Sequence, residues 1–298
     1  MKIGLGTVQF GLDYGISNKS GKPSLEAVKK ILRFAHQEGI NFLDTAFSYG
    51  NSEEILGKCF DECSDFEIIT KTPKFSEKIS LRDVKNLEVS LFQSLSKLKK
   101  TNIYGLLIHD SIDLINENGC LLWNKMCELK SKGLVRKIGV SVYSAKQIDA
   151  ILENFDIDLI QLPINIFDQR LLKSGHLKKL KVKNIEIHAR SVFLQGLLLM
   201  DLKEIPSQLQ KFGGLIGAYD FYLKNNNLSR LNAALGFILG LKEIDKIILG
   251  INSLKELVEI VNITKNFSSK FNEKFNFGEF ACFDEKLLNP SVWTKGQI

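Results

Sequence analysis

Cysteine is scarce in this 298-residue chain, and its spacing suggests neither a metal site nor a disulfide framework. The cysteines are odd in number, form no CxxC pair and have no histidine at zinc-binding spacing; they are Cys59, Cys63, Cys120, Cys127 and Cys282. We therefore expect buried free thiols in a reducing compartment, and no bound metal.

Long hydrophobic runs and a strong excess of one charge are also absent. No stretch of eighteen apolar residues could span a membrane, and the N-terminal MKIGLGTVQFGLDYG lacks the apolar core of a signal peptide. Lys and Arg (40) exceed Asp and Glu (34) by 6, and the excess is spread along the chain. We expect a cytoplasmic protein that binds neither nucleic acid nor a membrane.

Short apolar runs alternate with longer amphipathic stretches along the whole chain. The runs predicted to be strands are Ile3–Leu5, Asn41–Asp44, Glu67–Lys71, Tyr104–His109, Lys137–Ser141, Leu159–Leu162, Ile185–Arg190 and Lys246–Leu249. The stretches predicted to be helices are Leu25–Glu38, Ser52–Glu62, Leu81–Lys99, Leu121–Lys132, Ala145–Asn154, Leu171–Lys181, Leu228–Leu241 and Leu254–Asn262. The residues that fit helix N-caps and C-caps are Ser24, Ser80, Gly39 and Gly133.

Eight strand–helix pairs predict parallel strands closed into a (β/α)8 TIM barrel. A doubly wound open sheet would normally use five to seven strands and begin with GxGxxG, but Gln9 stands where its third glycine would be. We expect a single domain over residues 1–298. The remaining length forms a long loop at Met200–Asn227, after strand seven, and a C-terminal extension over 264–298 that folds over the barrel mouth.

Three neighbouring strands end in residues that can carry out chemistry. Active sites of such barrels lie at the carboxyl ends of the strands, where Asp44, Lys71 and His109 would meet. Tyr49 follows Asp44 closely enough to join them. A buried Lys beside this Tyr should lower its pKa, and Asp44 should keep Lys71 charged. Alone, the Asp–Lys pair could be a purely structural ion pair.

These residues lie in segments that resemble the aldo-keto reductase family. The matching segments are LGTVQFG at 5–11, NFLDTAFSYGNSEEILG at 41–57, IITK at 68–71, LLIHD at 106–110, KIGVSVYS at 137–144, LIQLPINIFDQR at 159–170 and GINSLKELVEIV at 250–261. The resemblance implies a (β/α)8 barrel that reduces an aldehyde or ketone with NAD(P)H. It also implies that Tyr49 is the general acid, that Lys71 and Asp44 tune its pKa, and that His109 orients the carbonyl.

The resemblance extends to residues that hold the cofactor. It implies that Ser141 and Gln161 hold the nicotinamide carboxamide, although Val142 stands where Asn is usual. Arg190 replaces the aromatic that usually stacks on the nicotinamide; it could stack, bind phosphate, or be a mere strand-end cation. The other implied contacts, in the turn after strand one and in the pyrophosphate loop after strand seven, are Gly6, Thr7, Ser191 and Gln195.

The adenosine end matches the family least well. Asn252 and Ser253 are implied donors at a helix start, and Glu259 matches an acidic adenine contact. Glu256 stands where many members carry Arg, and a carboxylate there favours NADH, although Lys255 could compensate. Because the family as a whole favours NADPH, we expect NADP(H) slightly ahead of NAD(H).

The substrate pocket is implied by three further positions. Val8 and Asp110 occupy positions that often carry a large aromatic side chain, and Phe47 could supply an apolar wall. An acidic rim at Asp110 suits a hydroxylated or sugar-like carbonyl, unless Asp110 merely caps the next turn.

Two other functions remain open at this stage. The altered nicotinamide contacts leave room for a regulatory or sensor protein that binds cofactor with little turnover. A lyase or isomerase using Lys71 as a Schiff base is disfavoured, because Asp44 would keep that lysine protonated. The sequence does not identify the physiological substrate, the direction of the reaction or the oligomeric state.

Overall fold

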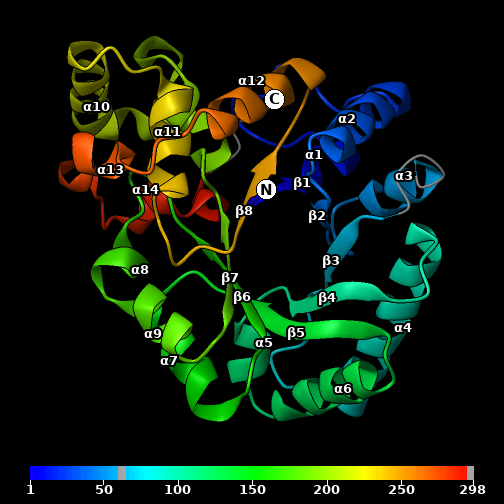
Figure 1. The fold of residues 1–298 in the computed structure, drawn as a ribbon. Coiled ribbons are helices and arrows are strands. Elements are labelled where there is room, and N and C mark those ends of the chain that lie inside the picture. The colour runs from blue at the N-terminus through cyan, green and yellow to red at the C-terminus, as the bar shows by residue number, and fades with distance from the viewer. Residues whose placement is uncertain (60–64, 294–298) are drawn as a thin grey trace.

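The computed structural model describes residues 1–59 and 65–293. Its parallel strands follow one another in sequence order around a closed barrel, in which β8 pairs with β1 (Figure 1). The strands are β1 (Ile3–Gly6), β2 (Phe42–Asp44), β3 (Glu67–Lys71), β4 (Ile103–Ile108), β5 (Val135–Ser141), β6 (Leu159–Pro163), β7 (Glu186–Arg190) and β8 (Lys246–Gly250). The predicted (β/α)8 barrel is confirmed.

Helices cover the outside of the barrel between successive strands (Figure 1). The main ones are α2 (Leu25–Gln37), α3 (Ser52–Lys58), α4 (Leu81–Leu98), α6 (Cys120–Ser131), α7 (Ala145–Asn154), α9 (His176–Val182), α11 (Arg230–Leu239) and α12 (Leu254–Lys265). Short additional helices are α1 (Val8–Gly11), α5 (Ile112–Ile115) and α8 (Arg170–Lys173). The helix predicted over Leu171–Lys181 is broken at Gly175, whose φ of +78° separates α8 from α9.

Helix ends follow the capping residues read from the sequence. The Ser24 hydroxyl accepts a hydrogen bond from the Ala27 amide at 3.2 Å, and the φ angle of Gly39 is +74° just beyond the end of α2. The predicted helix over Ser52–Glu62 is observed to Lys58, with Cys59 as its C-cap; residues 60–62, like Cys63, lie outside the described residues.

The interior of the barrel is a small apolar cluster, separate from the larger core between strands and helices. It is formed by Phe42, Ile69, Leu107, Leu159 and Ile248, with Tyr104 packed against it. These side chains fill the barrel below the carboxyl ends of the strands, so the mouth is a shaped surface and not the entrance of a pore.

The long connection predicted after strand seven is present, but within Met200–Asn227 it contains the helix α10 (Gly213–Asn225), which was not predicted from the sequence. Three 3-10 segments precede it: Leu194–Leu199, Leu202–Glu204 and Ser207–Phe212. Three glycines in GGLIGAYDFYLKN lower its helix propensity, and Tyr219 is fully buried on its inner side. Packing of this inner face stabilises a helix that local sequence does not favour.

The tail contains α13 (Phe271–Lys274) and α14 (Glu285–Leu288), with 3-10 turns at Gly278–Phe280 and Pro290–Val292. It packs beside α8, α10 and α11 (Figure 1), where the Phe280 ring lies 5.6 Å from Tyr219. It also contacts the loop after β6, since the Cys282 amide donates to the Phe167 carbonyl at 2.8 Å. The tail thus lies at the rim of the mouth, and no described tail residue lines the pocket that opens there.

Two further expectations concern thiols and absent features. Cys59 is buried, but Cys120 and Cys127 are exposed on α6, so the expectation of burial is wrong for these two. Within residues 1–59 and 65–293 no helix is long and apolar enough to cross a membrane. The same residues contain no group of three or more His, Cys, Asp or Glu side chains placed to hold a metal ion.

Candidate active site

A buried ion pair lies at the carboxyl ends of β2 and β3. The Lys71 ammonium donates to both carboxylate oxygens of Asp44, at 2.8 and 2.7 Å, and to the Thr45 carbonyl at 2.9 Å. Lys71 is 1% and Asp44 4% exposed. The β2–β3 register places Asp44 opposite Ile69, two residues before Lys71, so both side chains reach the same side of the barrel mouth.

Tyr49 and His109 complete a compact group above this pair. The Lys71 nitrogen lies 5.0 Å from the centre of the Tyr49 ring, and the His109 ring meets Tyr49 edge-on at 5.8 Å. The Ser48 hydroxyl lies 3.3 Å from Nδ1 of His109. The structure therefore brings together the four residues expected from three separate strand ends.

The protonation of this group differs from the expectation in one respect. Burial raises the pKa of Tyr49 above its ordinary value, and the nearby Asp44 carboxylate raises it further. The pKa of Tyr49 is therefore raised and not lowered as expected, because burial and the Asp44 carboxylate outweigh the lowering by the positive charge of Arg190. Burial and then Lys71 lower the pKa of His109 to about 4. At neutral pH Tyr49 is therefore protonated and His109 uncharged.

A cavity of about 630 Å3 opens directly over these residues. It extends from Tyr49 and His109, past the ends of β5 to β8, to the start of α12. The expected site residues that line it are Gly6, Thr7, Val8, Asp44, Tyr49, His109, Ser141, Gln161, Arg190, Ser191, Gln195, Asn252, Glu256 and Glu259. Its size and polar lining are typical of a small-molecule or cofactor site.

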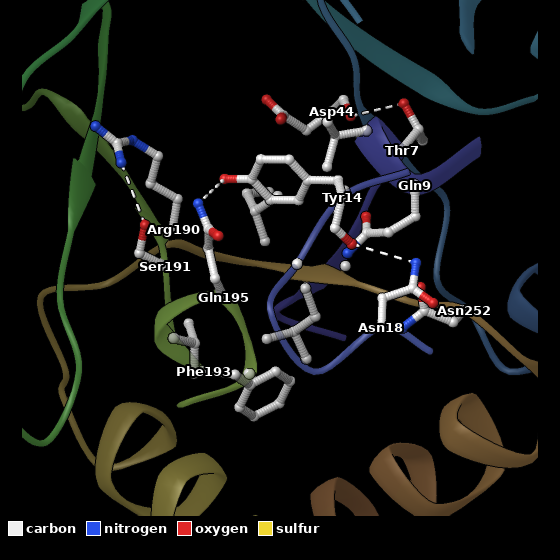
Figure 2. Close-up of a pocket in the computed structure, with 18 of the residues that line it drawn as sticks. Thr7, Gln9, Tyr14, Asn18, Asp44, Arg190, Ser191, Phe193, Gln195 and Asn252 are labelled. Atoms are coloured by element: carbon white, nitrogen blue, oxygen red, sulfur yellow. Dashed lines mark hydrogen bonds between the residues drawn. The ribbon is translucent and has the colours of Figure 1, made fainter. Parts of the chain in front are cut away.

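Two loops meet over the middle of the cavity. The Gln195 side chain donates to the Tyr14 hydroxyl at 3.2 Å (Figure 2). The backbone carbonyl of Gln195 accepts from the Ile16 amide at 3.1 Å. Gly196 has a φ of +95°, and a Cβ there would lie 1.8 Å from the Ser17 hydroxyl oxygen. Only glycine fits this contact, which joins the loop after β7 to the loop after β1 across the end of β8.

The far end of the cavity carries more negative than positive charge. Glu256 accepts from the Asn252 amide at 2.9 Å, and the Ser253 hydroxyl accepts from the Glu256 amide at 3.2 Å. Ser253 thus caps α12 and does not itself line the cavity. Arg230 lines this end, but it is paired with Asp220 at 2.5 Å and Asp201 at 3.4 Å.

Two expected substrate residues lie away from the cavity. Phe47 packs under the Lys97 ammonium, which is 5.0 Å from its ring centre. The Asp110 carboxylate accepts from the Ile112 amide at 3.1 Å and so caps the turn that begins α5. Neither lines the cavity, whereas Val8 does. The acidic rim that suggested a sugar-like substrate is therefore not formed by Asp110.

Tyr14, Tyr143 and Arg230 are among the lining residues that sequence reasoning missed. Tyr143 follows the end of β5 by two residues, and this position could have drawn attention to it. Arg230 gave no signal, because it begins a helix reached only after the irregular segment that follows β7. Tyr14 acts through its contact with Gln195, and sequence spacing does not reveal such a contact.

Comparison with known proteins agrees with this geometry. Residues 2–276 match the model of the "Aldo/keto reductase family". The chain is 30% identical to the aldo-keto reductase YhdN of Bacillus subtilis over 188 residues, 58% of this chain and 53% of that protein. It is 26% identical to the NADH-specific methylglyoxal reductase of Escherichia coli over 223 residues, 66% of this chain and 65% of the relative.

Solved structures share the fold at lower identity. The holo form of the aldo-keto reductase AKR11C1 from Bacillus halodurans superposes with a TM-score of 0.75 at 17% identity, covering 94% of this chain and 92% of that one. The glycerol dehydrogenase AKR11B4 of Gluconobacter oxydans gives a TM-score of 0.69 at 19% identity, covering 94% and 90%. Because residues 2–276 of its 298 residues match the family model, the chain belongs to the aldo/keto reductase family of oxidoreductases.

Proposed function

We propose that this protein reduces a small aldehyde or ketone with NADH, with Tyr49 as the general acid. The observation that carries the proposal is the Asp44–Lys71 ion pair, which lies under Tyr49 and beside His109 at one end of a long cavity. A merely structural ion pair would not need a largely buried tyrosine and a neutral histidine lining the same cavity.

The residues of the cavity fit a dinucleotide. Two buried oxygens on its wall, Oε1 of Gln9 and Oδ1 of Asn252, have no hydrogen-bond partner within the described residues. A ligand that presents amide or hydroxyl donors would satisfy both. Ser191 and the capped start of α12 add polar groups along the same path. When bound, the nicotinamide supplies the hydride.

The chain's own residues supply the proton and the orientation. Tyr49, held protonated by burial, donates its phenolic proton to the carbonyl oxygen that becomes the alcohol. Ser48 lies at Nδ1 of His109, so we assign Nε2 to the same carbonyl oxygen. The Lys71 charge lies under the Tyr49 ring and stabilises the phenolate left after proton transfer. Asp44 holds the Lys71 ammonium in place, and the Gln161 side chain in turn donates to the Asp44 carboxylate.

The charges at the far end of the cavity support NADH over NADPH. Glu256 and Glu259 both line it, Arg230 is already paired with two aspartates, and Lys255 is exposed and does not line it. A 2′-phosphate would meet repulsion there, whereas a ribose hydroxyl could donate to a carboxylate. The name of the NADH-specific methylglyoxal reductase agrees with both the cofactor and a small polar carbonyl.

The proposal is tested by titrating NADH and NADPH and then screening small carbonyls, methylglyoxal and glyceraldehyde among them. We expect turnover with a preference for NADH, and a loss of about 100- to 10,000-fold in kcat in Tyr49→Phe with unchanged NADH affinity. Full activity in Tyr49→Phe would exclude the assigned acid. Binding of NADH without turnover on the whole panel would instead favour the sensor function, and a clear preference for NADPH would exclude the cofactor assignment.

A further inference from the structure

Arg190 is a half-buried cation on the wall of the cavity with no acidic partner. Its guanidinium donates to the Val142 carbonyl at 3.1 Å and to the Ser191 hydroxyl at 3.2 Å. In the part of the chain that the structure describes, no aspartate or glutamate forms an ion pair with it. A guanidinium has five N–H donors, so donors remain for a ligand.

The other cations at this cavity are already neutralised. Lys71 is held by Asp44, and Arg230 is held by Asp220 and Asp201. A cation withdrawn from water is stabilised when an anion reaches it, and the described chain supplies none for Arg190. The anion would therefore come from a bound molecule.

The Arg190 side chain points toward the end of the cavity that contains His109, and so toward the part of the bound molecule that lies at that end. From the end of β7 the guanidinium reaches past β6 to Val142 and Tyr143, just after β5. The neighbouring strand β4 leads directly into His109, and Arg190 adds to the lowering of the pKa of His109 after burial and Lys71. Asn252 and the start of α12 lie on the other side of the cavity, as Figure 2 shows for Asn252.

The neighbours of Arg190 hold its guanidinium in a fixed position. The Tyr143 ring lies against it, 4.2 Å from the guanidinium carbon to the ring centre. Backbone amides of Tyr143 and Ser144 both donate to the Gln147 side chain, at 2.7 and 3.1 Å, where α7 begins. The Val142 carbonyl and the Tyr143 ring are thus fixed by the cap of α7, and the guanidinium is oriented before a ligand arrives.

We propose that Arg190, stacked on Tyr143, binds an oxyanion carried by the carbonyl substrate. The substrate class is then an aldehyde or ketone that also bears a carboxylate or a phosphate. This inference rests on the proposed reductase function and adds the charge of its substrate. A planar guanidinium recognises either oxyanion through paired N–H donors.

The test compares charged and neutral substrates of similar shape. Succinic semialdehyde is paired with butanal, and glyceraldehyde 3-phosphate with glyceraldehyde, in the wild type, Arg190→Met and Arg190→Lys. Arg136→Met, an exposed site at the opposite end of the barrel, is the control for loss of a positive charge. We expect a wild-type preference for the anionic member of one pair, and that pair distinguishes carboxylate from phosphate.

In Arg190→Met we expect KM for the preferred anion to rise roughly 10- to 100-fold, with partial recovery in Arg190→Lys. The rise in KM for the neutral partner should be several-fold smaller, and Arg136→Met should match the wild type. Equal losses on charged and neutral substrates, or no wild-type preference in either pair, would contradict the proposal. Weakened NADH binding alone would assign the guanidinium to the cofactor pyrophosphate instead.

A binding measurement keeps this inference separate from the reductase function. Calorimetry with succinate and with methyl phosphate on the NADH-loaded protein requires no turnover. Binding of one of them that disappears in Arg190→Met supports the oxyanion site even if no carbonyl is reduced. Absence of binding by both, in a protein that reduces neutral carbonyls, would refute the site and leave the reductase function intact.

Discussion

The two ends of the barrel each contain a carboxylate bound to a lysine and a tyrosine nearby, and the cavity of about 630 Å3 lies over the pair at the carboxyl end. At the carboxyl end Asp44 binds Lys71 under Tyr49. At the amino end Glu186 accepts hydrogen bonds from Lys137, His188 and, at 2.6 Å, from the Tyr104 hydroxyl. The same residue types thus occur twice in one molecule.

The difference lies in what surrounds each group. Rings and long side chains close the amino end, where Phe42 meets His188 at 5.1 Å, Tyr104 at 5.4 Å and the Lys246 ammonium at 4.9 Å. The Tyr104 hydroxyl donates a hydrogen bond to Glu186, whereas no hydrogen bond within the described chain engages the Tyr49 hydroxyl beside the cavity. A tyrosine is available for chemistry only where its proton faces a ligand.

The largest expected effect is on stability when the cation at the carboxyl end is removed. Lys71→Met leaves the buried Asp44 with only the Gln161 amide, at 2.7 Å, and should lower the free energy of unfolding by about 3–5 kcal/mol. Lys137→Met at the amino end should cost about 1 kcal/mol or less, because Lys137 is one-third exposed and Glu186 keeps His188 and Tyr104. Urea unfolding of both variants measures the difference.

Asp44→Asn in the Lys71→Met background provides the control. Removing both charges should restore most of the stability without restoring turnover. Equal losses in Lys71→Met and Lys137→Met would mean that burial does not distinguish the two ends.

The sequence predicted the barrel and the proximity of the strand-end residues, because both depend on local patterns. Runs of β-branched and aliphatic residues mark the strands, and parallel strands bring their last residues to one face. Asp44, Lys71 and His109 could therefore be placed together before any contact was known. The cap at Ser24 was predictable for the same reason, since it depends only on residues one turn apart.

The failures concern properties that arise between distant segments. Burial raises the pKa of Tyr49 most and the nearby Asp44 carboxylate raises it further, and spacing reveals neither effect. Helix α10 forms against Phe167 and Phe280, which pack on Tyr219 from segments far away in the chain. Asp110 fits an alignment position in the pocket wall, but a local hydrogen bond to the Ile112 amide holds it in a turn.

An intermediate effect is expected from acid. Since the pKa of His109 falls from 6.5 to about 4 on folding, the unfolded chain binds more protons between these values, and stability falls as pH falls through that window. The loss should reach about 2–3 kcal/mol near pH 4. His109→Gln should remove this part of the pH dependence, as measured by urea unfolding at pH 7, 5.5 and 4.

Glu186, at the amino end, affects stability in a lower range of pH than His109 does. Burial alone would raise its pKa, but the hydrogen bonds from His188, Lys137 and Tyr104 outweigh burial and lower it. Its contribution to the free energy of unfolding is present above the ordinary glutamate pKa and is lost only in stronger acid. A His109→Gln variant whose stability still fell from pH 6.5 to 4 as steeply as the wild type would contradict this assignment.

The smallest expected difference in stability between the two ends comes from one substitution made at both. Tyr104→Phe removes a single hydrogen bond to Glu186 and should lower the free energy of unfolding by about 1–2 kcal/mol, with kcat/KM unchanged within about twofold. Tyr49→Phe should leave the free energy of unfolding unchanged and lower kcat/KM, since no hydrogen bond in the described chain engages its hydroxyl and we propose that this hydroxyl is the proton donor. Unfolding curves and initial rates on the two variants, measured together, form the matched test. Loss of turnover in Tyr104→Phe without loss of stability would show that the amino end is coupled to the site and is not only its support.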